Sequence, residues 1–288
     1  MAGRANGHHH SGNGRSDASV DGERHPLAEQ PAGEAIPMLM DEHGGRILAL
    51  TRRMCGNEAD AEDLVQETFL QALRKWDQFE GRSKPETWLY TIAARLCMRK
   101  RRKRSGEPDH IASLESDMSF AATRPVPDLP ERQDDPLWRQ LRQEQREPLE
   151  HAIVELPAGY RMPLILKDIV GFSVAEVASI LGLKDATVKT RVHRARQQIR
   201  TKLSATLPSR DAPPPAYPKR VCLDLLRAKQ EALDRGEAFP MTDEAFCDRC
   251  RAVFTSLDLA ADICARMGDD TLPEHLRELV LADIAAEE

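Results

Sequence analysis

The chain has 288 residues, of which 41% are hydrophobic and 31% charged, and its formal net charge is −6. This length is enough for about two or three domains, and an aromatic content of 5% argues against a large β-sandwich. No apolar run approaches the roughly 20 residues of a membrane-spanning helix, and the N-terminus lacks the apolar stretch of a signal peptide. We therefore expect a cytoplasmic protein that has no membrane partner.

Composition divides the chain into six segments. Residues 1–36 are rich in Gly, Ser, Asn and His and predict a disordered tail. Helical periodicity covers residues 37–104, 144–205 and 221–288. A mixed-charge segment with five prolines, 105–143, and a proline-rich segment, 206–220, predict linkers between them. The predicted class is all-α, with two helical modules joined by a flexible linker and a small helical C-terminal domain.

The segment 144–205 contains the pattern of a helix-turn-helix. Ser173 and Glu176 have the spacing of a capping box, Gly182 supplies a turn, and Asp185 is placed to cap the next helix. That second helix has an apolar stripe on one side and, on another, the basic residues Lys189, His193, Arg196 and Arg200. Arg and Lys on such a helix can reach base edges and phosphates in a major groove. The alternative is a solvated helical hairpin with incidental charge.

The stretch from Leu156 to Leu203 resembles region 4 of the extracytoplasmic-function (ECF) sigma factors of the sigma-70 family. In that family this helix-turn-helix reads the minus-thirty-five promoter element. The resemblance assigns that role to six residues of the second helix: Thr187, Lys189, Thr190, Arg191, His193 and Arg194. Response regulators have a similar helix-turn-helix, so this module alone does not fix the class.

The run from Asp60 to Leu96 resembles sigma region 2, which response regulators lack. In the family, its acidic helix binds the clamp of the largest subunit of core RNA polymerase. The resemblance assigns that contact to Asp60, Asp63, Gln66 and Glu67. An acidic rim beside an apolar stripe suits a helix-docking surface.

The loop after that helix and the start of the next one resemble the part of region 2 that reads the melted minus-ten element. Aromatic and cationic side chains stabilise single strands by stacking and charge. The candidates are Phe79, Arg82, Ser83, Lys84, Thr87 and Trp88, although Trp88 is equally suited to a core position. Promoter DNA, double-stranded and melted, is therefore the second expected partner.

Four of the six cysteines lie in the C-terminal segment: Cys222, Cys247, Cys250 and Cys264. Zinc takes four ligands in a tetrahedral array, and a C-x-x-C pair supplies two of them. The segment resembles the zinc-binding anti-sigma domains, but Asp243 stands where they carry His. Either Cys264 or Asp243 is the expected fourth ligand. A thiol redox switch and a metal-free domain with buried cysteines remain alternatives.

We find no nucleophile–base pair and no phosphate-binding loop, so we predict no enzymatic activity and no cofactor for the sigma modules. The predicted function is a promoter-specific initiation factor, restrained by the acidic C-terminal domain folding over the basic surfaces or by a separate anti-sigma factor. The rival functions are a stand-alone helix-turn-helix regulator and a metal or redox sensor.

Overall fold

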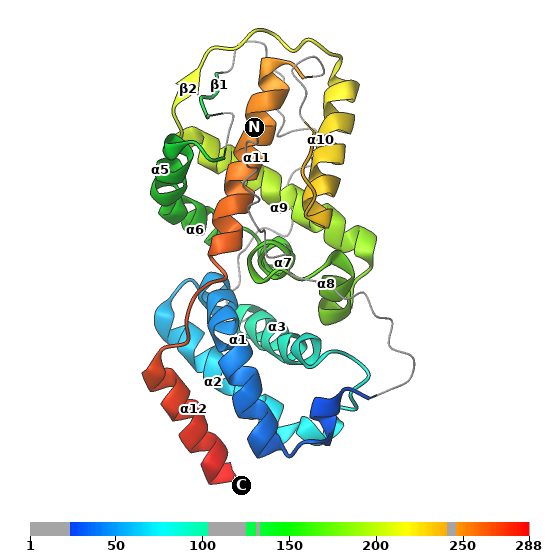
Figure 1. Ribbon diagram of the computed structural model, residues 1–288, viewed down its shortest axis with the longest axis vertical. Helices are drawn as coiled ribbons and strands as arrows, with labels where there is room; N and C mark the ends of the chain where they lie inside the picture. The colour runs from blue at the N-terminus through cyan, green and yellow to red at the C-terminus, as the bar shows by residue number, and fades with distance from the viewer. Residues whose placement is uncertain (1–23, 103–124, 131–132, 241–245, 288) are drawn as a thin grey trace, which may run out of the picture.

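The computed structural model describes residues 24–102, 125–130, 133–240 and 246–287 (Figure 1). Apart from one pair of two-residue strands, the regular structure of these residues is helical, which confirms the all-α class. Within the described ranges no helix is both long and apolar enough to cross a bilayer.

The first helices form an N-terminal unit, residues 24–102. Helix α2 begins after Asn57, whose side-chain oxygen accepts a 2.8 Å hydrogen bond from the backbone N–H of Asp60. Helix α1 ends at Gly56, which has a φ of 75° and so takes the left-handed conformation that favours glycine. The elements are η1 Pro26–Glu29, α1 Ala32–Cys55, α2 Glu58–Arg74, η2 Trp76–Gln78 and α3 Pro85–Arg102.

A middle unit, residues 125–210, follows with the helix-turn-helix. Ser173 and Glu176 form the predicted capping box at the start of α8, and Gly182 ends that helix with a φ of 63°. Asp185 is the first residue of α9, and Lys184 takes the N-cap position in its place. The elements are β1 Val126–Pro127, α5 Pro136–Glu144, α6 Arg146–Val154, α7 Ala158–Leu164, the π-helix η3 Ile165–Val170, α8 Val174–Leu181, α9 Asp185–Thr206 and β2 Ser209–Arg210.

The C-terminal unit has three helices that lie on different parts of the molecule. Helices α10 Lys219–Arg235 and α11 Asp248–Arg266 lie beside α9 of the middle unit, whereas α12 Glu274–Glu287 lies beside α1 and α2 (Figure 1). One hydrophobic core runs through all three units, from Ala35 to Ile284. A second, smaller core joins α10 to α11 around Phe254. The C-terminal helices therefore span both of the other units.

Two predicted segment boundaries are wrong. Helix α1 begins at Ala32, inside the predicted disordered tail, because Ala35 and Ile36 already bury their side chains in the core. Helix α5 lies inside the predicted linker 105–143, where Asp135 caps the backbone N–H of Leu137 and Trp138 is 1% exposed. The first turn of α1 and the nine residues of α5 are both too short to give a periodic pattern that sequence reasoning can detect.

The segment predicted as a proline-rich linker is held against its neighbours. Strand β2 pairs antiparallel with β1, with Val126 opposite Arg210. Arg249 of α11 donates hydrogen bonds to the carbonyls of Ala212 and Pro213, at 2.8 and 2.6 Å. Held in this way, the segment 206–220 returns the chain so that α10 lies beside α9.

Candidate nucleic-acid and polymerase interfaces

The six residues predicted to read the minus-thirty-five element lie on the first half of α9. Lys189 and Thr190 are exposed, and Thr187, Arg191 and Arg194 are half-buried. His193 is only 8% exposed because its side chain faces α10. Five of the six can therefore be reached at least in part from solvent, and the sixth is covered by the C-terminal unit.

Helix α10 covers α9 through a buried group of charges. Asp234 contacts His193 Nε2 through Oδ2 and Arg196 Nη1 through Oδ1, both at 2.8 Å. Arg196 also donates to Asp168 at 2.6 and 2.8 Å, and Gln230 donates to the carbonyl of His193. Burial acts to raise the pKa of Asp234, but His193 and Arg196 outweigh it and hold this pKa below its usual value. His193 and Arg196, both on the side predicted to be basic and DNA-facing, are thus engaged within the protein.

Three aromatic rings pack together where the minus-ten candidates were expected. The ring of Phe79 lies 5.1 Å from that of Trp76 and 5.3 Å from that of Trp88, and Trp76 donates its indole N–H to the carbonyl of Gln30. Phe79 is 5% exposed and Trp88 is half-buried. In this conformation Phe79 is a core residue and presents no face for stacking on a base.

The loop before α3 faces the helix-turn-helix. Lys84 Nζ lies 3.0 Å from the Oε1 of Glu176, the capping residue of α8. Arg82 and Ser83 are exposed, and Arg82 pairs with Glu80. Thr87 is 7% exposed on the first turn of α3. One residue predicted to read the minus-ten element, Lys84, therefore contacts the helix-turn-helix at α8.

The four residues of α2 predicted to bind polymerase each have a partner within the protein. Lys100 of α3 pairs with Asp60 at 2.6 Å and with Asp63 at 3.6 Å. Gln66 donates to Asp283 of α12, and Glu67 accepts a 2.7 Å hydrogen bond from the side chain of Gln71. Helix α12 therefore reaches the middle of the predicted polymerase-binding face.

Helix α12 packs on α2 and α1 with one apolar face. Leu276, Val280 and Ile284, four residues apart, are 3%, 0% and 4% exposed. Polar contacts lie around this face: His275 Nε2 lies 3.4 Å from Glu62, and Arg277 forms an ion pair with Asp41. A helix repeats every 3.6 residues, so this spacing puts all three apolar side chains on the side that meets α2.

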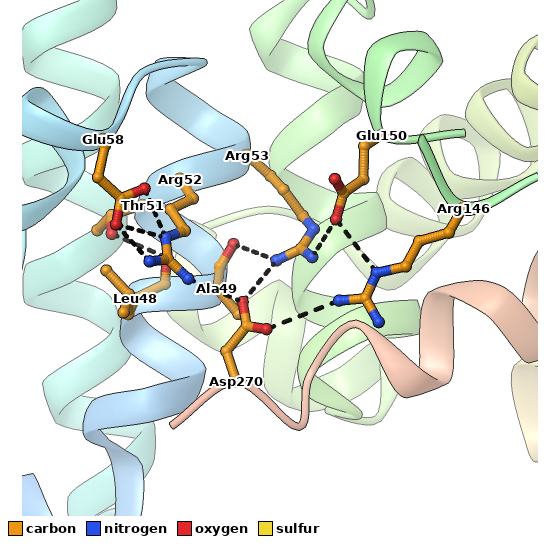
Figure 2. Close-up of polar contacts among 9 residues, drawn as sticks. All are labelled: Leu48, Ala49, Thr51, Arg52, Arg53, Glu58, Arg146, Glu150 and Asp270. Carbon is orange, nitrogen blue, oxygen red and sulfur yellow. Dashed lines mark hydrogen bonds and ion pairs between the residues drawn. The ribbon is translucent and has the colours of Figure 1, made fainter. Parts of the chain in front are cut away.

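A further charged group joins α1, α6 and the segment between α11 and α12 (Figure 2). Asp270 lies 3.4 Å from Arg53, 3.7 Å from Arg52 and 3.8 Å from Arg146. Glu150 of α6 lies 2.8 Å from Arg53. One carboxylate thus contacts arginines from both of the units that resemble sigma regions.

The structure separates Cys264 from the other three cysteines predicted to bind zinc, which lie close together. Cys222 and Cys250 lie in the smaller core, with Cys247 packed against it, and Cys264 lies in the main core. Cys250 and Cys264 are on one helix, and 14 residues of helix span about 21 Å, so they cannot share a metal ion. The prediction that Cys264 completes the site is wrong. Among the described residues no group of three or more His, Cys, Asp or Glu side chains could hold a metal ion, and Asp243 lies outside those residues.

Sequence reasoning missed the acidic partners of these contacts. Asp168, Asp234 and Asp270 each neutralise an arginine far away in the chain, at Arg196 or Arg53. Each is a single aspartate without a local pattern. The one signal was general: an acidic C-terminal segment in a chain with basic strips.

Comparison with known proteins supports the two sigma modules separately. Residues 39–107 match the family model of sigma-70 region 2, and residues 146–199 match that of sigma-70 region 4. Helices α10, α11 and α12 lie beyond both matches. The chain is 33% identical to the ECF RNA polymerase sigma factor SigW of Bacillus subtilis over 175 residues, which cover 59% of this chain and 89% of SigW.

Two further proteins are similar over comparable lengths. The ECF sigma factor SigE of Mycolicibacterium smegmatis is 33% identical over 61% of this chain and 64% of its own. A solved structure of CnrH in complex with the cytosolic domain of CnrY is 26% identical, covers 62% of this chain and 96% of its own, and has a TM-score of 0.45. The identity with SigW over most of that protein's length, together with both region models, shows that the chain belongs to the ECF sigma factors of the sigma-70 family.

Proposed function

We propose that the chain is a non-enzymatic specificity subunit of bacterial RNA polymerase that its own C-terminal helices hold in a closed, inactive form. The first part follows from the family: an ECF sigma factor binds core polymerase and directs it to promoters. Such a protein needs no cofactor and works in the cytoplasm with polymerase and DNA.

The promoter contacts are proposed for α9 and for the loop before α3. Lys189 and Thr190 are the exposed residues that would enter the major groove. Opening DNA requires no chemical step on the protein, because binding energy offsets base unstacking of about a few kcal/mol per step. Polymerase would bind along α2, at Asp60, Asp63, Gln66 and Glu67.

The closed form is supported above all by one observation: α12 buries its apolar face on α2 and binds Gln66. A polymerase clamp that docks on the same helix must first displace α12. Helix α10 acts in the same sense, because Asp234 engages His193 on the helix proposed to read DNA. A separate anti-sigma factor is not needed for this restraint.

The test compares two adjacent residues of α12 in the full-length chain. Val280→Asp places a charge in the buried face, whereas Leu279→Asp places it at a residue that is 45% exposed. We expect Val280→Asp to bind core polymerase more tightly than wild type and to start transcription on a promoter library, and Leu279→Asp to behave as wild type. Failure of both variants to bind core polymerase would overturn the sigma function.

The stand-alone regulator makes the opposite prediction. Such a protein binds its DNA site without polymerase, and a pull-down with core polymerase recovers none of it. The acidic face of α2 gives a regulator no advantage, so this same pull-down separates the two functions.

A further inference from the structure

The segment Gly268–Pro273, between α11 and α12, is the place where all three units meet. It leaves α11 beside the middle unit and passes over α1 before α12 begins on α2 (Figures 1 and 2). Its backbone packs closely against glycines and backbone of the other two units, and its Asp270 side chain forms ion pairs with both of them.

The backbone fit depends on glycines in two units. A Cβ on Gly45 of α1 would lie 1.9 Å from the carbonyl oxygen of Asp270, and one on Gly44 would lie 2.8 Å from Leu272 Cδ2. A Cβ on Gly268 would lie 2.3 Å from the carbonyl oxygen of Ile169 in η3. Glycine inside a helix is less favourable than alanine by about 1 kcal/mol. The pair at 44 and 45 therefore weakens α1 itself and leaves a notch that the segment fills.

The charged contacts converge on the Asp270 carboxylate, which is 18% exposed. Arg52 and Arg53 come from α1, and Arg146 comes from α6. Glu58 pairs with Arg52, and Glu150 pairs with Arg53 and Arg146. Three arginines thus face three carboxylates, and the loss of Asp270 would leave the arginines in excess around Arg53, which is 5% exposed.

We infer that Asp270 is a latch: by neutralising arginines of the N-terminal and middle units together, it holds both units and the start of α12 in the closed form. The inference rests on the proposed function, since closing matters only if polymerase and DNA use the covered surfaces. Isolated exposed ion pairs contribute little to stability, but this carboxylate serves three cations, one of them buried. Removing it unbalances contacts in two units at once.

The latch differs from α12 in what it controls. Helix α12 covers the proposed polymerase face directly, whereas Asp270 touches none of the four residues proposed to bind polymerase. Its effect on polymerase binding must therefore come through the equilibrium between closed and open forms. A change at Asp270 should raise affinity without altering the binding surface itself.

The experiment uses the full-length chain and measures its affinity for purified core polymerase by fluorescence anisotropy. Asp270→Asn keeps the shape of the side chain and removes its charge, and its exposed neighbour Asp269→Asn is the matched control. Gly45→Ala is an independent variant that fills the notch. We expect Asp270→Asn and Gly45→Ala to raise the affinity roughly tenfold, and Asp269→Asn to leave it unchanged.

A second measurement excludes a purely structural role. If Asp270 only supported folding, its substitution would lower the melting temperature and the affinity together. A latch predicts a lower melting temperature with a higher affinity. Wild-type affinity in both Asp270→Asn and Gly45→Ala, alongside tighter binding by Val280→Asp, would overturn the latch and leave the proposed function standing. No binding to core polymerase by either Val280→Asp or Leu279→Asp would overturn the proposed function itself.

Discussion

Helices α10 and α12 cover the two surfaces proposed to bind promoter DNA and polymerase, and they do so by different physical means. On α9, the contacts of α10 are charged and buried: Asp234 meets His193 and Arg196. On α2, α12 buries the apolar side chains of Leu276 and Val280, and its charged residues stay at the edge. One cover depends on paired charges and the other on apolar area.

Because the two contacts differ in kind, α10 on α9 and α12 on α2 should respond differently to a substitution. A buried ion pair adds little net stability, because both charges lose their water when they meet, yet removing one partner is strongly destabilising. Apolar burial adds about 25 cal/mol for each Å² removed from water. We therefore expect α10 to be the more sensitive to a single charge substitution, and α12 to supply more of the net free energy that keeps the molecule closed.

The largest effect is expected from Asp234→Ala. It leaves His193 without its carboxylate, and Arg196 with Asp168 and Gln230 but without the second acidic partner. We expect the free energy of unfolding to fall by about 3 kcal/mol, and binding of promoter DNA by α9 to increase. Urea unfolding and a DNA gel-shift assay measure the two changes. Asp224→Ala, on the exposed side of α10, should change neither. Equal losses in both variants would mean that the buried charges do not hold α10.

A somewhat smaller effect is expected from Ile284→Ala, which truncates the apolar face of α12. The side chain is 4% exposed, and removing a buried Ile side chain destabilises by about 2–5 kcal/mol. We expect a loss near the lower end of that range, about 2 kcal/mol, because α12 packs on α2 and α1 with one face only. Hydrogen exchange should become faster in α12 and in the part of α2 beneath it, and should stay unchanged in α10. Leu279→Ala is the matched control. Faster exchange throughout the chain would show that the two covers are not independent.

The comparison also separates what sequence can predict from what it cannot. Local patterns gave the helix class and the capping box at Ser173, because each depends on residues within one or two turns. The side of α9 that carries His193 was predicted to face DNA, since a basic stripe at helical spacing looks the same whether water or another helix covers it. Its partner Asp234 lies 41 residues away, and no local pattern links the two.

The prediction that Cys264 completes a zinc site failed for a related reason. Spacing along the chain suggested four ligands, but the long continuous helix α11 keeps Cys264 away from Cys250. The same helix length brings Cys264 into the main core, near the middle unit. Helix boundaries, which sequence reasoning predicts least well, decided this case.

A pH titration tests the charged contact of α10 on α9 without changing the size of the Asp234 side chain. The folded-state pKa of Asp234 is lowered, so its contribution to stability is present above the ordinary Asp value of 3.8 and is lost as pH falls through the lower folded-state pKa. We expect wild type to lose stability below about pH 4 more steeply than Asp234→Asn, since the variant has no such carboxylate to protonate. The effect should be smaller than that of Asp234→Ala, because a protonated carboxyl group still fills its place. Parallel acid transitions in the two proteins would contradict this account.

The smallest effect is expected at the contact between the loop before α3 and the helix-turn-helix. Lys84 is 62% exposed where it meets Glu176, and exposed pairs contribute about 0–1 kcal/mol. Lys84→Met should therefore lower the free energy of unfolding by less than about 1 kcal/mol, and the capping box should keep Glu176 and α8 in place. Raising the salt concentration should weaken the wild-type contact to the level of the variant, because exposed charges are screened. A loss several times larger would mean that the loop before α3 and α8 hold the N-terminal and middle units together directly, and the contacts of α10 and α12 would then be secondary.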